Sequence, residues 1–394
     1  MAKQTVRDVD WQGKRALVRV DFNVPYRQGT VAISDDVRIR EALPTINYLR
    51  EAGAKVILCT HLGRPGGKPS EEWELGPIAA RLSELLGAPV IYVRDAVGEK
   101  AKQKASELEP GDVLLLENIR FWPGEEANDP EFARTLAGLA DVYVNDAFGT
   151  AHRAHASTEG VAHHLPAVAG LLMEKEITFL GKVLDSPDRP LAAVLGGAKV
   201  SDKIKVLERL IEHADGLYVG GGMAATFLKA KGLKIGASLL EQDLVQFCAD
   251  VVQRAGSKLH LPDDVVIAEK VEKHSPSKTV PVHEVPDGWM ILDIGPQTAG
   301  QYASELSQMG TVVWNGPMGV FEVPPFDKGT RVLADALADS HATTVVGGGS
   351  TAEAVGALGL AERMTHVSTG GGASLEFLEG KGLPGVAALM DKPR

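Results

Sequence analysis

Two lysines follow a short apolar run and a pair of glycines near the middle of the chain. Residues 191–210, LAAVLGGAKVSDKIKVLERL, have the pattern of a strand, a glycine turn and a helix. Lys199 and Lys203 are spaced so that both are expected on one face at the start of that helix. Cations gain nothing from the helix dipole at this end, which predicts a negatively charged ligand in front of them, phosphate above all. The alternative is an ordinary turn at Gly196 and Gly197 with both lysines in solvent.

A second cationic group follows four short aliphatic runs in the first half of the chain. Each run is typical of a buried strand, and polar or charged residues come directly after it. ALVRV precedes Asp21, Phe22 and Asn23, with Arg38 added by the DDVRI that follows; KVILCT precedes His61, Leu62, Gly63 and Arg64; DVLLLEN precedes Arg120; DVYVNDAFG precedes His152, Arg153 and His155. Because the carboxyl ends of parallel strands meet at one edge of a sheet, these side chains are predicted to lie together.

These residue types are suited to binding an anion that also carries hydroxyl groups. Guanidinium groups bind phosphate and carboxylate through two parallel hydrogen bonds, and Asp21 and Asn23 can orient neutral hydroxyls. Taken singly, each arginine would be interpreted as a solvated surface charge, and their repetition at strand ends is what favours a site. We expect His152 and His155 to support Arg153 rather than to act in catalysis.

Glycine clusters follow the predicted strands of the second half in a similar way. They lie at residues 220–222, 347–349 and 370–372, and the run TVVW leads into Asn315 and, further on, Glu322. Repeated strand, glycines and helix predict a sheet edge where the backbone can approach a polyphosphate and an adenine closely. The run WMILDIG is interpreted as one more strand of this set. Neither GxGxxG nor GxxxxGK[ST] occurs in the proper context, and tight turns or helix packing are the alternative role for the glycines.

Length and pattern predict an α/β protein of two domains. The 394 residues exceed the size at which a single core usually keeps growing. Short aliphatic runs alternate with helical patterns throughout, which implies parallel sheets covered by helices on both faces. The strong helical pattern LLMEKEITFLGKVL ends in DSPDRP, and we interpret it as the connector between the domains.

Charge and cysteine content exclude several classes of partner. The net charge of -11 argues against nucleic acid or an anionic membrane, so any anion site must be a local cluster of cations. Cys59 and Cys248 lie far apart and lack metal-ligand spacing, so buried free thiols are expected rather than a disulfide or a zinc site. The first residues lack the apolar segment of a signal peptide and no run has the length of a membrane span, which predicts a cytoplasmic protein.

Six motifs, in this order and over essentially the whole chain, resemble the phosphoglycerate kinase family: RVDFNVP, THLGRP, AHRAH, LGGAKVSDK, WNGPMGVFE and STGGGASLEFLEG. The resemblance implies two doubly wound parallel-sheet (Rossmann-like) domains joined by a helical hinge, with a C-terminal tail that returns to the first domain. We therefore expect a phosphoglycerate-binding domain at 1–170 plus 375–394, an interdomain helix at 171–185 and a nucleotide-binding domain at 186–374, in a monomer.

The same resemblance implies a phosphotransferase with a carboxyl acceptor, which moves a phosphoryl group reversibly between 1,3-bisphosphoglycerate and MgADP, directly and in line, on closure of the hinge. The residues expected to hold the phosphoglycerate are Asp21, Phe22, Asn23, Arg38, His61, Leu62, Gly63, Arg64, Arg120 and Arg153. Those expected to hold ADP or ATP are Gly196, Lys199, Lys203, Gly220, Asn315, Glu322, Gly348, Gly349, Ser350 and Thr351. Catalysis would depend on Arg38, Lys199, Lys203 and the N–H groups of Gly371 and Gly372, since such a transfer needs alignment and positive charge more than covalent help.

One position departs from the family pattern. Ser350 stands where the family commonly has an aspartate that helps to place the nucleotide magnesium, so no residue of the chain is assigned as a certain metal ligand. Three other functions remain open. A nucleotide-sensing module would not need both cationic clusters, a dehydrogenase would need a dinucleotide fingerprint, and a different acyl-phosphate kinase would reject 3-phosphoglycerate.

Overall fold

The computed structural model describes residues 2–27 and 29–393, which form two compact units. Unit 1 runs to Thr178 and takes in the chain again from Gly382, and unit 2 is Phe179–Lys381. The division falls inside helix α6 (Leu171–Asp185), and residues 375–381, expected with the first domain, belong to unit 2. Each unit is described by itself.

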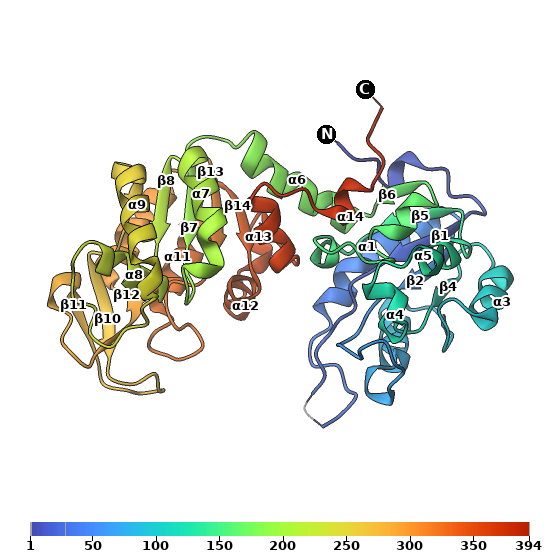
Figure 1. Ribbon diagram of the computed structural model, residues 1–394, viewed down its shortest axis with the longest axis horizontal. Coiled ribbons are helices and arrows are strands. Elements are labelled where there is room, and N and C mark those ends of the chain that lie inside the picture. The colour runs from blue at the N-terminus through green and yellow to red at the C-terminus, as the bar shows by residue number, and fades with distance from the viewer. Residues whose placement is uncertain (1, 28, 394) are drawn as a thin grey trace. The chain divides into compact units, whose positions relative to one another are not determined.

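Unit 1 is built on a six-stranded sheet in the order β3-β4-β2-β1-β5-β6 (Figure 1). Every neighbouring pair in it is parallel, as the alternation of strand and helix patterns predicted. The strands are β1 (Arg15–Arg19), β2 (Lys55–Cys59), β3 (Val90–Tyr92), β4 (Val113–Leu115), β5 (Val142–Asn145) and β6 (Ala167–Ala169).

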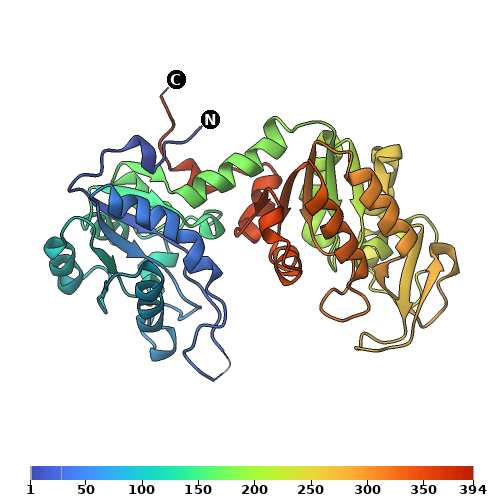
Figure 2. The ribbon, with the colours of Figure 1, turned by 180° about the vertical axis from the view of Figure 1, so that it is seen from behind.

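Helices cover this sheet because its strands are apolar on both faces. On one face, Ala16 and Val18 of β1 pack in a cluster with Ile46 of α1 and Leu82 of α2; Figure 2 shows α1 in blue in front of the sheet. The helices of unit 1 are α1 (Val37–Glu51), α2 (Gly76–Leu86), α3 (Glu99–Glu107), α4 (Pro123–Glu126), α5 (Pro130–Ala137) and α14 (Pro384–Ala387), with the first part of α6.

The C-terminal residues complete unit 1. The Gln4 N–H donates to the Met390 carbonyl at 2.8 Å, and the Met390 N–H donates to the carbonyl of Ala167, the first residue of β6, at 2.9 Å. The Gly385 N–H donates to the Ala151 carbonyl at 2.9 Å, and the Asn145 amide donates back to Gly385 at 3.2 Å. Backbone from the two ends of the chain is therefore paired within one unit.

Unit 2 repeats the architecture with a sheet in the order β15-β14-β13-β7-β8-β9, again parallel throughout. Its strands are β7 (Leu191–Leu195), β8 (Gly216–Val219), β9 (Leu259–His260), β13 (Thr311–Asn315), β14 (Thr343–Gly347) and β15 (His366–Val367). Its helices are α7 (Ile204–His213), α8 (Met223–Ala230), α9 (Val245–Ala255), α10 (Pro296–Leu306), α11 (Lys328–Asp339), α12 (Gly349–Ala357) and α13 (Gly372–Leu378). Figures 1 and 2 show α7 and α11 on opposite faces of the sheet.

A third, antiparallel sheet was not expected from the sequence. It has the order β11-β10-β12 and is made of β10 (Asp264–Ala268), β11 (Ser277–Pro281) and β12 (Met290–Ile294). The prediction that WMILDIG belongs to the same set of parallel strands was wrong, because β12 pairs antiparallel with β10. A short apolar run looks alike in either sheet, so local sequence does not reveal its partner.

Candidate functional site

The predicted sheet edge of unit 1 is confirmed as a fold feature. The four runs that precede Asp21, His61, Arg120 and Arg153 are β1, β2, β4 and β5, which are adjacent in the order β4-β2-β1-β5. Their carboxyl ends therefore deliver these four residues to one edge of one sheet.

Hydrogen bonds tie the loops after β1 and β2 together. The Gly63 N–H donates to Asn23 Oδ1 at 2.9 Å, and the Phe22 N–H donates to the Thr60 hydroxyl at 2.9 Å. Arg38, from the second position of α1, donates from Nη1 to Asp21 Oδ2 at 2.7 Å while 39% of its side chain stays exposed. Asp21 thus orients Arg38 and leaves further guanidinium N–H groups open to a ligand.

Arg120 is fixed by contacts with other residues at the same edge of the sheet. Its side chain is 5% exposed, Nη1 donates to the Gly63 carbonyl at 2.8 Å, and Nε lies 3.4 Å from Glu126 Oε1. Asn118, which the sequence did not single out, accepts the N–H groups of Leu62 and Arg120 on Oδ1, each at 3.2 Å. Burial lowers the pKa of Arg120, but a guanidinium remains a cation at neutral pH.

Arg64 and Arg153 are exposed at this edge. Arg153 Nε–H donates to His152 Nε2 at 3.3 Å, which agrees with a supporting part for that histidine. Burial, followed by the charges of Arg120, Arg19 and Arg153, lowers the pKa of His155 to about 4, so this ring is neutral at neutral pH.

A buried charged layer beneath the edge was missed at the level of sequence. It consists of Arg19, the last residue of β1, with Ser157 and Glu125, each 1% exposed or less. Arg19 Nε–H donates to Ser157 Oγ at 2.8 Å, and Ser157 donates its hydroxyl and its N–H to Glu125 at 2.7 and 2.9 Å. Burial raises the pKa of Glu125, and the charge of Arg19 opposes that rise. The signal was an arginine inside the aliphatic run ALVRV, where a charge needs a partner.

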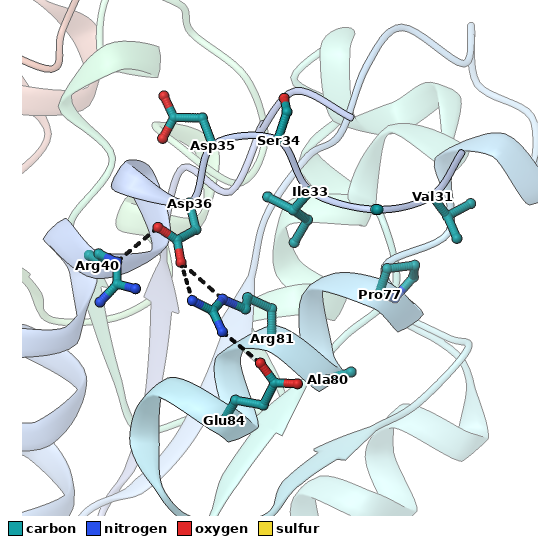
Figure 3. Close-up of a pocket in the computed structure, with 11 residues that line it drawn as sticks. Val31, Ile33, Ser34, Asp35, Asp36, Arg40, Pro77, Ala80, Arg81 and Glu84 are labelled. Atoms are coloured by element: carbon teal, nitrogen blue, oxygen red, sulfur yellow. Dashed lines mark hydrogen bonds and ion pairs between the residues drawn. The ribbon is translucent and has the colours of Figure 1, made fainter. Parts of the chain in front are cut away.

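A cavity of about 810 Å³ in unit 1 lies between residues 31–36 and helix α2, and both of its arginines are already paired (Figure 3). Arg81 donates to Asp36 Oδ2 from Nε and Nη2 at 2.9 and 2.7 Å, and to Glu84 at 2.6 Å. Arg40 donates to Asp36 Oδ1 at 2.8 Å. These bonds fix the start of α1, and with it the helix that carries Arg38, rather than offering cations to a ligand.

In unit 2 a cavity of about 420 Å³ lies against strand β12 and the loop after β13. Of the residues predicted for the nucleotide, Glu322 and Ser350 line it. The other lining residues are Gly197, Ala198, Gly222, Leu239, Val271, Met290, Ile291, Leu292, Pro317, Gly319 and Val320. Leu239 and Val271 are large apolar side chains left 48% and 43% exposed, which suits a flat apolar ring. The sequence analysis did not predict this apolar side of the cavity, because it considered only residues at the ends of parallel strands.

Gly196 and Gly220 serve the packing of loops rather than the lining of this cavity. A Cβ on Gly196 would lie 2.2 Å from the Pro317 carbonyl oxygen, and a Cβ on Gly220 would lie 2.6 Å from Met318 Sδ. The Gly197 N–H donates to Pro317 and the Gly221 N–H to Met318, at 2.9 and 2.8 Å. Glycine is required here because three strand-end loops approach backbone to backbone.

The two lysines are not on one helical face, so that prediction was wrong. Helix α7 begins at Ile204, after a 3₁₀ turn at Ser201–Lys203, and Lys203 has a non-helical ψ of 0°. The N–H groups of Val200 and Ser201 are also taken, because both donate to Glu241, at 2.6 and 3.2 Å. The N–H groups of the segment just before this helix are therefore not open to an anion.

Lys203 nevertheless has the surroundings of an anion ligand. It is 8% exposed, and burial lowers its pKa. Among the described residues its ammonium has neither an ion pair nor a hydrogen bond, and the charge of the exposed neighbour Asp202 only partly offsets the effect of burial, whereas Lys199 is exposed. A buried cation without a bonded partner is costly and favours an incoming anion.

The remaining predicted residues lie around the ends of β13 and β14. Asn315 Nδ2 is buried and makes no hydrogen bond within the described chain, and the nearest atom to a Cβ on Gly348 would be this nitrogen, at 3.0 Å. Thr351 Oγ1 accepts the Gly316 N–H at 2.6 Å and is internal, while Gly349 and Ser350 are exposed at the start of α12. Gly371 and Gly372 begin α13 with open space at their Cβ positions, so the backbone there is accessible.

Within residues 2–27 and 29–393 no three carboxylate, histidine or cysteine side chains are grouped as metal ligands. None of the helices described is both long and apolar enough to cross a membrane. Cys59 and Cys248 are buried free thiols, as predicted.

Comparison with known proteins gives one consistent result. The family model described as phosphoglycerate kinase matches residues 6–381. Proteins named phosphoglycerate kinase from Herpetosiphon aurantiacus and Pelotomaculum thermopropionicum are each 58% identical over 100% of both chains. Solved structures of phosphoglycerate kinase from Coxiella burnetii and Pyrococcus horikoshii align with TM-scores of 0.90 and 0.84 at 43% and 36% identity, each over 98% of both chains.

Proposed function

The chain belongs to the phosphoglycerate kinase family, and from that premise we propose which of its residues carry out the reaction. The enzyme is a glycolytic phosphotransferase that moves a phosphoryl group reversibly between 1,3-bisphosphoglycerate and ADP, giving 3-phosphoglycerate and ATP. This activity rules out the three alternatives that the sequence alone left open, namely a sensing module, a dehydrogenase and a different acyl-phosphate kinase.

We propose that the strand-end residues of unit 1 hold the phosphoglycerate. The set is Asp21, Phe22, Asn23, Arg38, His61, Leu62, Gly63, Arg64, Arg120 and Arg153. Support comes from the concentration of guanidinium groups at one edge in a protein of net charge -11. Arg64, Arg153 and part of Arg38 are open to solvent, so they can bind phosphate and carboxylate oxygens directly.

We propose that the cavity of unit 2 takes the adenine and ribose, with Leu239 and Val271 against the ring and Glu322 at a ribose hydroxyl. The phosphates would be bound by Lys199, Lys203, Asn315 and the backbone of Gly348–Thr351. The observation that carries this assignment is Lys203, a buried ammonium that makes no ion pair or hydrogen bond in the described chain and is opposed only by the charge of its exposed neighbour Asp202. Asn315 Nδ2, a buried donor without an acceptor there, supports it. Gly196 and Gly220 would act indirectly, by letting the loops approach.

Direct phosphoryl transfer needs no covalent bond between the substrate and the protein. We propose that Arg38 and Lys203 neutralise charge on the phosphoryl group as it passes in line between the acyl oxygen and the nucleotide, with N–H groups at Gly371 and Gly372 as further donors. Because one set of residues comes from unit 1 and the other from unit 2, transfer would require hinge closure that excludes water.

Magnesium enters this proposal with the nucleotide. The cavity offers one carboxylate, Glu322, and one hydroxyl, Ser350, which are too few to hold the ion without phosphate oxygens. When bound, the ion would neutralise phosphate charge. The cytoplasmic location and the monomeric state predicted from the sequence stay predictions.

A coupled assay tests the proposal. 3-Phosphoglycerate and MgATP are supplied, and formation of the acyl phosphate is followed through its reduction. Arg38→Ala should abolish most transfer, by about two or more decades in kcat, while MgATP affinity stays unchanged. The matched control is Arg134→Ala, which removes an exposed arginine of helix α5 in the same unit. Wild-type transfer rates in Arg38→Ala would remove Arg38 from the mechanism.

A further inference from the structure

His61 lies at the centre of the cationic edge but is not itself a cation. It is 4% exposed, and its pKa is held well below the usual range by burial first and then by the charges of Arg19, Arg120, Arg38 and Arg153. At neutral pH the ring is therefore neutral and has one N–H donor and one bare nitrogen. Which nitrogen carries the proton decides what the ring can offer a ligand.

The neighbours of Nδ1 settle that question. Arg19 Nη2 lies 3.1 Å from Nδ1, within hydrogen-bond distance, whereas the nearest oxygen of Asp21 is 3.9 Å away. A guanidinium has only donors, so a proton on Nδ1 would place two N–H groups face to face. Nδ1 must accept, and the proton is on Nε2. Nε2 makes no hydrogen bond to any residue that the structure describes.

Arg19 is fixed in the orientation that this bond requires. It is 1% exposed, Nη1 donates to the Val20 carbonyl, and Nε donates to Ser157 Oγ at 2.8 Å. Ser157 in turn bonds both oxygens of the buried Glu125. The planar guanidinium thus has three partners on three sides, and a rotation that released His61 would leave a buried guanidinium N–H without an acceptor.

We propose that Arg19 is a positioning residue that holds His61 as the neutral Nε2–H tautomer, so that His61 gives the phosphoglycerate a hydrogen-bond donor and no charge. This rests on the proposed place of His61 in the phosphoglycerate site. Arg19 itself is too deeply buried to touch the substrate.

The residues at this edge of the sheet would contribute two different kinds of interaction. Arg38, Arg64, Arg120 and Arg153 supply charge, while His61 recognises one substrate oxygen through a directional bond. The groups that face His61 are the carboxylate of Asp21 and the guanidinium groups of Arg19, Arg120, Arg38 and Arg153. With cations in the majority, the donor stays the same across the pH range in which exposed histidines change charge.

The test is nitrogen NMR of the full-length enzyme labelled with 15N-histidine, with the His61 signals assigned by their loss in His61→Gln. We expect a bare Nδ1 and a protonated Nε2 in the ligand-free enzyme, unchanged between about pH 5 and about pH 8. In Arg19→Met, Nδ1 should gain a proton in part of the molecules, and His61 should titrate at higher pH. The KM for 3-phosphoglycerate should rise about tenfold with a smaller change in kcat.

Arg15→Met is the matched control, because it removes the arginine at the other end of β1, which pairs with Asp141 at 2.7 Å. It should leave the His61 signals and the KM as in the wild type. If Arg19→Met does not fold, Arg19→Lys keeps a cation opposite Glu125 but cannot bond all three partners, and a mixed tautomer is expected. A proton on Nδ1 in the wild type, or unchanged His61 signals in the folded Arg19 variant, overturns the proposal.

One further measurement separates this inference from the proposed function. Adding 3-phosphoglycerate to the wild type should move the Nε2 signal. If it does not, His61 is no substrate ligand and the functional part of the proposal fails, whatever the tautomer. If it does while Nδ1 carries the proton, the substrate site stands and the role of Arg19 is refuted.

Discussion

At the scale of single residues, Lys203 is the side chain whose surroundings say most about chemistry. Its ammonium is buried without an ion pair or hydrogen bond in the described chain, so it should stabilise charge on the moving phosphoryl group more than in the bound ground state. We expect Lys203→Ala to lower kcat by about two or more decades and to change nucleotide affinity much less. Lys205→Ala, an exposed lysine two positions on, is the control for loss of charge. An unchanged kcat would remove Lys203 from the mechanism.

Ser350 leads to a prediction about magnesium. A hydroxyl is uncharged and cannot attract the ion as a carboxylate would. Ser350→Asp should therefore lower the magnesium concentration needed for half-maximal activity, and calorimetry should show tighter MgADP binding at low magnesium. Ser350→Asn, which adds the shape without the charge, should do neither. The hypothesis fails if the aspartate variant needs as much magnesium as the wild type. That result is expected if the exposed carboxylate of Glu353 already attracts the ion in place of the missing aspartate.

At the scale of elements, two of the first N–H groups of helix α6 are bound by the buried carboxyl group of Asp146. Asp146 Oδ1 accepts the N–H groups of Leu172 and Met173 at 2.9 and 3.2 Å, and Oδ2 is buried without a hydrogen bond in the described chain. Burial raises the pKa of Asp146 from 3.8 to about 6. A carboxyl with a raised pKa binds its proton more tightly when folded, so its stabilisation is present at low pH and is lost as the pH rises from about 4 to about 6.

We therefore expect the free energy of unfolding of the wild type to fall relative to that of Asp146→Asn between about pH 4 and about pH 7, by on the order of 3 kcal/mol at most. The denaturation midpoint should fall with it. Asp141→Asn is the control of opposite sign, since its hydrogen bond to Arg15 lowers the pKa of Asp141 and its stabilisation is lost on acidification. Urea unfolding followed from about pH 7 to about pH 3 measures both, since the Asp141 contribution is lost only as the pH falls below about 4. Parallel curves for the wild type and Asp146→Asn would contradict the prediction.

The elements also mark where sequence reasoning succeeded and where it stopped. Four strand ends could be predicted because their aliphatic runs are followed at once by polar residues, and the sheet order puts them side by side. The start of α7 could not, because Glu241, distant in sequence, takes the N–H groups of Val200 and Ser201. Strand β12 and the apolar wall of the cavity likewise depend on tertiary pairing that no local pattern encodes. Arg19 was overlooked because it continues the strand pattern while its partners come from residues far along the chain.

At the scale of the whole molecule, the two sets of proposed ligands come from separate units, one before Pro190 and one after it. Transfer that excludes water should then need both substrates for full closure. Small-angle scattering should show a smaller radius of gyration with 3-phosphoglycerate and MgATP together than with either alone. The same comparison on Lys203→Ala separates closure from turnover. Identical profiles for the free and doubly liganded enzyme would rule out a closing hinge.

The pairing of the two chain ends sets the order in which this protein can be completed during its synthesis. Lys3 is bridged to Asp391, and Gln4 and Ala167 are bonded to Met390, so unit 1 lacks these contacts until residues 390 and 391 have been translated. All of unit 2 is made in the meantime. Unit 1 is therefore begun first but gains these contacts only after unit 2 has been made, and a chain cut before Gly382 would contain all of unit 2 while Gln4 and Ala167 of unit 1 lacked their partner Met390.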